Sequence, residues 1–434
     1  MKLVIHWFRR DLRLEDNVAL YHAMSSPFPV LPLFIFDEDI IEDLPPDDAR
    51  ITFIYDALLS IQSQLEAAGR TLHIKKGKPV DVFSSLLKEY DIQGVYTNRD
   101  YEPYALERDE AVKSLILSHG KPFHTFKDHV VFEASEIRKD DGFPYTVYTP
   151  YSKKWLQKLE KIKPLIEYRT EGRIERFYPR QNEDQFPSIE SVGFKRSHIK
   201  ASEFNLSESL LAEYAAQRNI PGLQGTSRLG VHLRFGTISI RKTVNYVRGL
   251  SLVYLKELIW REFFIQILVH FPDVVTKAFK SKYDRIPWVN NRVQFEKWCQ
   301  GKTGYPMVDA GMRELNTTGF MHNRVRMVCA SFLCKHLLID WRWGESYFAE
   351  KLLDYELASN NGNWQWSAGT GCDAAPYFRV FNPTTQQEKF DSDLVYVKRW
   401  IPEYGSDDYP APMVIHKEAR EKAIAVYKEA LASS

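Results

Sequence analysis

The chain has 434 residues and a formal net charge of +1, so it is too long for one ordinary hydrophobic core and lacks the global basic field that marks many nucleic-acid-binding proteins. Two or three domains are expected, and a polyanionic partner would need a local basic patch. The four cysteines include no C-x-x-C pair, which favours reduced thiols in a cytoplasmic protein over a disulfide framework or a zinc site. Residues 1–13 lack the uninterrupted apolar run of a signal peptide, and no segment is long enough to span a membrane.

Strand and helix patterns alternate in the first part of the chain. Short apolar runs predict strands at 3–7, 30–36, 72–74 and 94–96, and helical periodicity predicts helices at 50–68, 80–90 and 104–118. This alternation indicates a parallel sheet with helices on both faces, which we assign to an α/β domain over residues 1–128. The turn after Trp7 reads FRRDLR and lacks the Gly-rich dinucleotide fingerprint, which disfavours a dinucleotide-dependent oxidoreductase.

The rest of the chain reads as a connector followed by helices. Prolines, charges and isolated aromatics over residues 129–200 predict a long connector draped over a surface. From 201 to 434 the apolar period is helical, which predicts an all-α domain. Helices are expected at 206–217, 240–250, 253–270, 307–316, 323–338 and 345–357, with a short Lys/Glu/Ala helix at the end.

The segment 360–383, NNGNWQWSAGTGCDAAPYFRVFNP, is unlike an ordinary core helix. It carries Trp364 and Trp366, and eight of the ten tryptophans lie after residue 259. Indoles gathered in this way suit bulk packing, base stacking or redox work beside a cofactor. In a helix, Trp364 and Trp366 would lie about 200° apart, so they could have different neighbours.

Helical spacing groups further polar residues. Two sets recur at i, i+3 and i+4: Glu257, Trp260 and Arg261 in one helix, and Asn323, Arg326 and Met327 in another. Each set therefore shares one face of its helix. Glu with Trp, or Asn with Met, suits a lined cavity better than an aliphatic core, although a solvated face remains open.

Three further patterns each allow two interpretations. Arg326 and Asp354 could form a buried ion pair that holds a charged cofactor, or a surface pair, or none. The hydroxyls of Thr226 and Ser227 could cap a helix or bind a phosphate. Basic and aromatic residues at 377–399 suit a phosphate backbone, but interspersed acidic residues also fit a solvated face. No Ser-His-Asp set, phosphate-binding lysine loop, carboxylate dyad or metal-ligand spacing is evident.

Several long motifs resemble those of photolyases and cryptochromes, in the same order. They are WFRRDLRLEDN at 7–17, GTSRLGVHLRFGTIS at 225–239, KELIWREFF at 256–264, GKTGYPMVDAGMREL at 301–315, MHNRVRMVCASFL at 321–333 and the 360–383 block. The resemblance runs to about residue 405. It implies a Rossmann-like α/β antenna domain and an all-α domain that holds one FAD, fully reduced in the active state.

The resemblance also assigns cofactor contacts. The expected FAD-binding residues are Tyr214, Thr226, Ser227, Arg228, Leu229, Glu257, Trp260, Asn323, Arg326, Asp354, Glu356 and Asn360. Among them, Arg326 and Asp354 would pair beside the isoalloxazine ring, and Asn360 would face flavin N5. Plant cryptochromes carry an Asp at this last position, so Asn360 favours the repair branch.

The implied reaction is light-driven repair of cyclobutane pyrimidine dimers in DNA. Excited reduced flavin would pass an electron to a flipped-out dimer, and the electron would return after the ring splits. By motif position, the lesion and its flanking phosphates would contact Arg218, Glu257, Trp260, Asn323, Arg324, Met327, Trp366, Arg379 and Lys389. The catalytic set would be Glu257, Asn323, Met327 and Asn360, with Trp364, Trp341 and Trp288 as an electron-transfer triad spaced by 23 and 53 residues.

Asn323, Met327 and Trp366 match class I dimer photolyases most closely. Folate-binding members usually carry a Glu and a Cys where this chain has Ala105 and Val275, so the antenna chromophore could be a deazaflavin, a flavin, a folate or none. Glu356 is one methylene longer than the family's usual Asp. A blue-light photoreceptor cryptochrome is the alternative function, and a cytoplasmic monomer without a membrane partner is expected.

Overall fold

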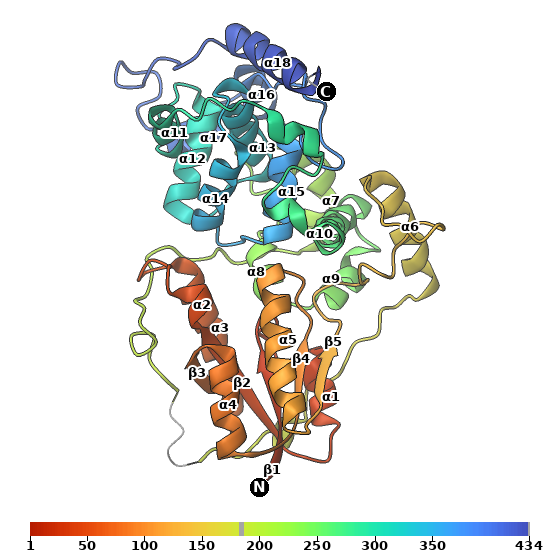
Figure 1. Cartoon of the computed structure of the whole chain (residues 1–434). Helices are drawn as coiled ribbons and strands as arrows, with labels where there is room; N and C mark the ends of the chain where they lie inside the picture. The colour runs from red at the N-terminus through yellow and green to blue at the C-terminus, as the bar shows by residue number, and fades with distance from the viewer. Residues whose placement is uncertain (182–185, 433–434) are drawn as a thin grey trace. The chain divides into compact units, whose positions relative to one another are not determined.

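The computed structural model describes residues 1–181 and 186–432, and the chain divides into two compact units (Figure 1). The first unit contains Met1–Glu136, Leu156–Ser202 and Leu229–Gly249, and the second contains Ile137–Trp155, Glu203–Arg228 and Leu250–Ser434. The two units therefore interleave along the chain, whereas the predicted domains at 1–128, 129–200 and 201–434 are contiguous.

The first unit is built on a parallel five-stranded sheet, which confirms the predicted α/β class. Its strands are β1 (Lys2–Phe8), β2 (Val30–Asp37), β3 (His73–Gly77), β4 (Asp91–Asn98) and β5 (Phe123–Phe126), in the order β3-β2-β1-β4-β5. The edge strand β5 was not predicted, because its residues FHTF are only half-buried and lack a continuous apolar run. Strand order reverses beside β1, where the carboxyl ends of β1 and β4 flank a crevice.

Helices pack against this sheet, as the strand–helix alternation predicts: α1 (Val18–Met24), α2 (Glu38–Ile41), α4 (Pro79–Glu89) and α5 (Pro103–Ser118) contact its strands. The unit also contains α3 (Ala49–Glu66), a 3-10 turn η1 (Ile174–Arg176), α8 (Gly230–Phe235) and α9 (Ile240–Val247). Trp7 of β1 packs in one apolar cluster with Phe83 of α4 and Val112 of α5. Burial of these side chains fixes the sheet register from one face.

The second unit is helical. Its helices are α7 (Glu208–Gln217), α10 (Leu252–His270), α11 (Arg292–Cys299), α12 (Pro306–Thr318), α13 (Asn323–Ser331), α14 (Trp341–Lys351), α15 (Leu357–Ala368), α16 (Pro383–Phe390), α17 (Val395–Trp400) and α18 (His416–Ala432). Shorter turns are η2 (Pro272–Val275), η3 (Ser281–Arg285) and the π-helical turn η4 (Phe332–His336). The predicted all-α class is confirmed.

Two expectations about helices were wrong. The segment 345–357 is not one helix: α14 begins at Trp341, because the Asp340 side chain accepts from Arg342 N, and it ends at Lys351, where Leu352 turns to an extended conformation. The segment 129–200, expected as an irregular connector, contains α6 (Tyr148–Lys161). This helix has an apolar stripe that its many lysines obscure in the sequence.

The cysteines Cys299, Cys329, Cys334 and Cys372 are free. Among the described residues, no helix is long and apolar enough to cross a membrane. In the same part of the chain, no group of three or more His, Cys, Asp or Glu side chains could hold a metal ion.

Candidate functional site

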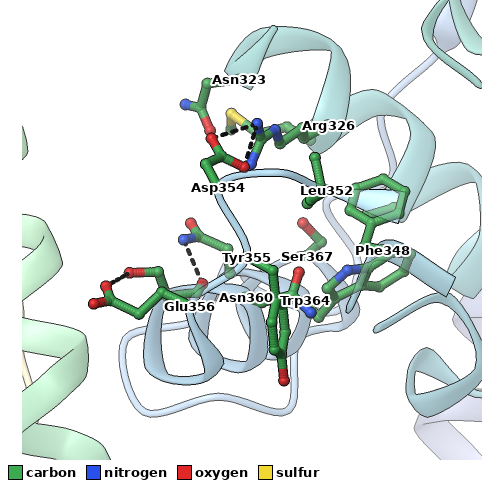
Figure 2. Close-up of a pocket in the computed structure, with 14 residues that line it drawn as sticks. Asn323, Arg326, Phe348, Leu352, Asp354, Tyr355, Glu356, Asn360, Trp364 and Ser367 are labelled. Carbon is green, nitrogen blue, oxygen red and sulfur yellow. Dashed lines mark hydrogen bonds and ion pairs between the residues drawn. The ribbon is translucent and has the colours of Figure 1, made fainter. Parts of the chain in front are cut away.

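A pocket in the second unit is walled by α13, the loop after α14, and α15 (Figure 2). Seven of the residues singled out from the sequence line it: Asn323, Arg326, Met327, Asp354, Glu356, Asn360 and Trp364. They come from three separate stretches of the chain, which the helical packing of α13 on α15 brings together. Polar groups converging in one concave site are typical of a cofactor pocket.

Arg326 and Asp354 form the ion pair that the sequence left open. Nη2 of Arg326 lies 3.1 and 2.9 Å from the two carboxylate oxygens of Asp354, and Figure 2 shows the pair on the pocket wall. Nε of Arg326 donates to the carbonyl of Met321 at 2.7 Å. The guanidinium is therefore held from two sides, so its planar fork is preorganised toward the pocket.

Asn360 is buried in α15 with its amide nitrogen fully used. Nδ2 donates to the main-chain carbonyl of Glu345 at 3.0 Å and to its Oε1 at 2.9 Å. Because a carbonyl can only accept, this contact fixes which amide atom is the nitrogen. Oδ1 is consequently the atom left to accept a hydrogen bond from a ligand, and burial raises the pKa of the Glu345 carboxyl beside it.

Glu356 is held in place from both sides of its carboxylate. Arg261 Nη2 donates to one oxygen at 3.0 Å, and Ser359 Oγ donates to the other at 3.0 Å. The pair with Arg261 links α10 to the pocket rim. A ribose contact by Glu356 would have to share these oxygens, and it stays a prediction.

A second group of predicted residues gathers around α10. Arg218, at the end of α7, pairs with Glu257 of α10. Ser227 Oγ lies 2.8 Å from the hydroxyl of Tyr254, and the ring of Tyr214 meets Tyr254 edge-on at 4.9 Å. Tyr214, Ser227 and Glu257 thus surround one end of α10, although they do not line the pocket of Figure 2.

The chain between these groups adopts an unusual conformation at Arg228, whose φ is 57°. Its guanidinium lies 3.5 Å from the ring centroid of Phe320, and its Nη2 is 4.0 Å from Glu314. Thr226 beside it is half-buried. Leu229 is buried and begins a segment of the first unit, where it precedes α8.

Trp260 of α10 has one face covered by an aromatic ring that sequence reasoning missed. Tyr148 stacks on it with ring centroids 3.6 Å apart and an interplanar angle of 5°. The Tyr148 hydroxyl donates to the carbonyl of Lys256 at 2.8 Å, and its main-chain N–H donates to Asp373 at 3.0 Å. Phe264 also lies against Trp260, with ring centroids 5.5 Å apart, so the indole is held by aromatic rings from α6 and from its own helix.

Trp364 and Trp366 have different neighbours, as a helical spacing predicts. Trp364 is 2 % exposed and lies edge-on to Phe348 and Trp298, at 5.0 and 6.1 Å. Its indole fits against α14 because Gly344 there has no side chain: an added Cβ would lie 2.1 Å from the Trp364 ring. Trp366 is half-buried, with Phe381 at 6.5 Å.

The other tryptophans of the expected triad lie in or beside the same apolar cluster. Trp341 is buried in the cluster that contains Trp364, and Trp288 is packed against it. Trp288 also meets Tyr427 of α18 edge-on at 5.9 Å. The cluster contains a further indole, Trp298 of α11, which contacts Trp364. The sequence analysis did not assign a role to this tryptophan.

Basic side chains gather around Phe390 of α16. The guanidinium of Arg324 lies 4.4 Å from this ring centroid and the ammonium of Lys389 lies 5.4 Å from it. Burial, and then the charges of Arg218 and Arg379, lower the pKa of Arg324. Mutual repulsion of this kind marks a local excess of positive charge, which suits a phosphate backbone.

Comparisons with known proteins identify the family. A family model described as "DNA photolyase" matches residues 4–168, and one described as "FAD binding domain of DNA photolyase" matches residues 254–407. Deoxyribodipyrimidine photo-lyases from Synechococcus sp. and Escherichia coli are 34 % and 36 % identical, with alignments that cover 98 % of this chain and 96 % and 98 % of theirs. The chain therefore belongs to the DNA photolyase family, and its second unit carries the FAD-binding domain.

Solved structures agree with this placement. A bacterial class III photolyase from Agrobacterium tumefaciens superimposes with a TM-score of 0.87 at 33 % identity, covering 99 % of this chain and 98 % of that one. An archaeal photolyase from Sulfolobus tokodaii with two FAD molecules gives 0.86 at 34 %, covering 99 % and 100 %. A Synechocystis sp. cryptochrome gives 0.84 at 26 %, covering 98 % and 99 %.

Proposed function

We propose that this chain repairs cyclobutane pyrimidine dimers in UV-damaged DNA under blue light. One observation carries the proposal: the pocket presents the neutral amide oxygen of Asn360 beside the Arg326–Asp354 pair. A neutral acceptor can stabilise a reduced cofactor without adding a competing negative charge. The names of the relatives, deoxyribodipyrimidine photo-lyases, agree with this chemistry.

The donor set of the pocket fits FAD. We expect Arg326, Asp354 and Asn360 to hold the isoalloxazine ring, and Tyr214, Thr226, Ser227, Arg228 and Leu229 to hold the phosphates and their surroundings. When bound in its reduced form, FAD would supply the light-driven electron chemistry that opens the dimer. The protein's part is to orient the ring, exclude water and hold a hydrogen-bond acceptor at Asn360 Oδ1.

The lesion would lie between Trp260 and Trp366, with polar contacts to Glu257 and Asn323 and an apolar contact to Met327. Because a carboxylate can only accept, a hydrogen bond from Glu257 to a pyrimidine requires a proton on the carboxyl group, whose Oε1 pairs with Arg218. Arg218 would contact a phosphate beside the lesion. Arg324, Arg379 and Lys389 complete the proposed DNA contact.

Trp364, Trp341 and Trp288 are proposed to deliver electrons to oxidised FAD. Trp364 and Trp341 share one buried cluster, and Trp288 lies at its half-buried edge. Trp364 lines the pocket and Trp288 is partly exposed, so electrons from a donor in solution could enter at Trp288 and reach the pocket at Trp364.

The antenna chromophore stays open among deazaflavin, flavin, folate and none. The crevice at the carboxyl ends of β1 and β4 is bordered by Arg10, which pairs with Asp100 at 2.9 Å and with Glu102 at 3.0 Å. Ala105, where folate-binding members carry a Glu, is buried in α5 and offers no polar group. This residue disfavours the folate.

Class I membership is proposed from Asn323, Met327 and Trp366. The alternative, a signalling cryptochrome, is supported by the likeness to the Synechocystis protein, but signalling alone would not need both Trp260 and Trp366. A monomer that binds damaged DNA in the cytoplasm remains part of the proposal.

The test is dimer loss in a defined oligonucleotide, measured with chemically reduced, FAD-loaded protein under blue light and in the dark. Repair in the light alone is expected. Glu257→Ala should slow repair while FAD stays bound, whereas Glu388→Ala, which removes the same charge from an exposed position on α16, should not. Intact dimers after illumination of FAD-loaded protein would exclude the repair function.

A further inference from the structure

Lys335 is a charged residue in an apolar setting. It lies in the π-helical turn η4 and is 1 % exposed. Its Nζ donates to the main-chain carbonyl of Arg379 at 2.9 Å. Among the described residues, no carboxylate pairs with it, and burial lowers the pKa of Lys335 to about 8.

A buried ammonium is costly to keep, so a residue that retains one needs a reason. Methionine would fill much the same volume without that cost. The partner of Lys335 is a single carbonyl 44 residues away in sequence, and short π-helical turns occur frequently at functional sites. The hydrogen bond therefore connects the buried turn η4 to the segment that contains Arg379.

That segment, residues 369–382, has no helix or strand and joins α15 to α16. Arg379 is exposed within a short turn, where its N–H donates to the carbonyl of Pro376 at 2.8 Å. Earlier in the segment, Asp373 accepts from Tyr148 N and Tyr377 stacks on Tyr427 with ring centroids 5.9 Å apart. The hydrogen bond from Lys335 ties the main chain of Arg379 to η4, whereas the contacts of Arg379 with Pro376 and Phe381 stay within the segment.

We propose that Lys335 is a positioning residue, which fixes the main chain at Arg379 so that its guanidinium is presented to a DNA phosphate alongside Arg324. Without the hydrogen bond from Lys335, segment 369–382 could move and so relieve the repulsion between Arg379 and Arg324. The proposal rests on the proposed function, because it takes Arg379 as a DNA contact.

Two measurements test it. In the dark, the Kd for a dimer-containing duplex is measured against salt concentration for Lys335→Met, Arg379→Ala and the double variant. We expect each single variant to weaken binding by about threefold to tenfold and to reduce the salt slope by about 1, as for the loss of one phosphate contact. The double variant should be no weaker than Arg379→Ala, because both changes remove the same contact. Additive losses would overturn the proposal.

The second measurement does not depend on DNA. Amide hydrogen exchange of the FAD-loaded protein should rise in peptides covering 371–382 in Lys335→Met, and Arg379→Ala serves as the matched control in which the main-chain anchor remains. Unchanged exchange in these peptides would overturn the inference even if repair is observed. If Lys335→Met does not retain FAD, Lys335→Leu, which also lacks a donor, takes its place, and wild-type exchange in that variant would overturn the inference as well. Absence of repair by the wild-type protein would instead count against the proposed function alone.

Discussion

Asn360 Nδ2 donates to both the carbonyl and the carboxylate of Glu345, at 3.0 and 2.9 Å. This double contact ties α15 to α14 and sets the direction of the amide oxygen. The pocket therefore receives an acceptor whose orientation does not depend on the ligand, which lowers the cost of organising the site when the cofactor changes its redox state.

Asn360→Asp should destabilise the reduced cofactor. The new carboxylate would face Glu345 without an N–H to donate and would add negative charge beside the ring. We expect the midpoint potential of bound FAD to fall by about 30 mV, which corresponds to about 1.4 kcal/mol for two electrons, together with slower repair. Spectroelectrochemical titration measures it. Asn363→Asp is the matched control, because Asn363 borders the same pocket but is exposed; an equal shift there would contradict the assignment.

Tyr148→Leu should disturb Trp260 while Tyr148→Phe should not. Leucine removes the stacked ring, whereas phenylalanine keeps it and loses only the hydroxyl contact to Lys256. Loss of an aromatic stack costs about 0.5–1.5 kcal/mol, so the Kd for dimer-containing DNA should rise about twofold to tenfold in Tyr148→Leu.

Fluorine NMR of 5-fluorotryptophan-labelled protein provides a direct check. The Trp260 signal, assigned by its loss in Trp260→Phe, should move in Tyr148→Leu and stay near its original position in Tyr148→Phe. Equal shifts in both variants would show that the hydroxyl, and not the ring, controls the indole.

Trp364→Phe should block light-driven reduction of oxidised FAD and leave repair by chemically reduced protein nearly unchanged. Phenylalanine fills most of the space beside Gly344 but is far harder to oxidise than an indole. Flavin absorbance during illumination follows the first effect, and dimer loss follows the second. Trp298→Phe is the control for packing, since Trp298 contacts Trp364 in the same core. A similar loss of photoreduction in both variants would remove the special role of Trp364.

The stability of the wild-type protein relative to Lys335→Met should rise with pH above 8. Burial lowers the folded-state pKa of Lys335 to about 8, below its ordinary value of 10.5. Between these values the unfolded chain binds more protons, so the free energy of unfolding increases with pH. The gain should be on the order of 2 kcal/mol between pH 8 and pH 10. Urea unfolding of both FAD-loaded proteins measures the difference, and parallel curves would contradict it.

The helical period of the sequence predicted which side chains share one face of a helix. The shared faces of Glu257 with Trp260 and of Asn323 with Arg326 follow from 3.6 residues per turn, as do the separate neighbours of Trp364 and Trp366. The FAD phosphate contacts, by contrast, came from the family resemblance and remain predictions.

Contacts between residues far apart in the chain could not be predicted from the sequence. The stack of Tyr148 on Trp260 joins residues whose separation along the chain carries no pattern, and the segment around Tyr148 reads as irregular. The end of α14 at Lys351 was missed because apolar residues continue through Leu352 and Leu353, so hydrophobic period alone cannot show where the backbone leaves the helix.

Gly344 makes positions 344 and 364 sterically dependent on each other. The indole of Trp364 occupies the volume that a β-carbon at position 344 of α14 would need. A larger residue at 344 is compatible only with a smaller ring at 364 or with a displaced helix. The two positions are therefore expected to change together among natural variants of this fold. A mutant library that randomises one of them should randomise the other as well.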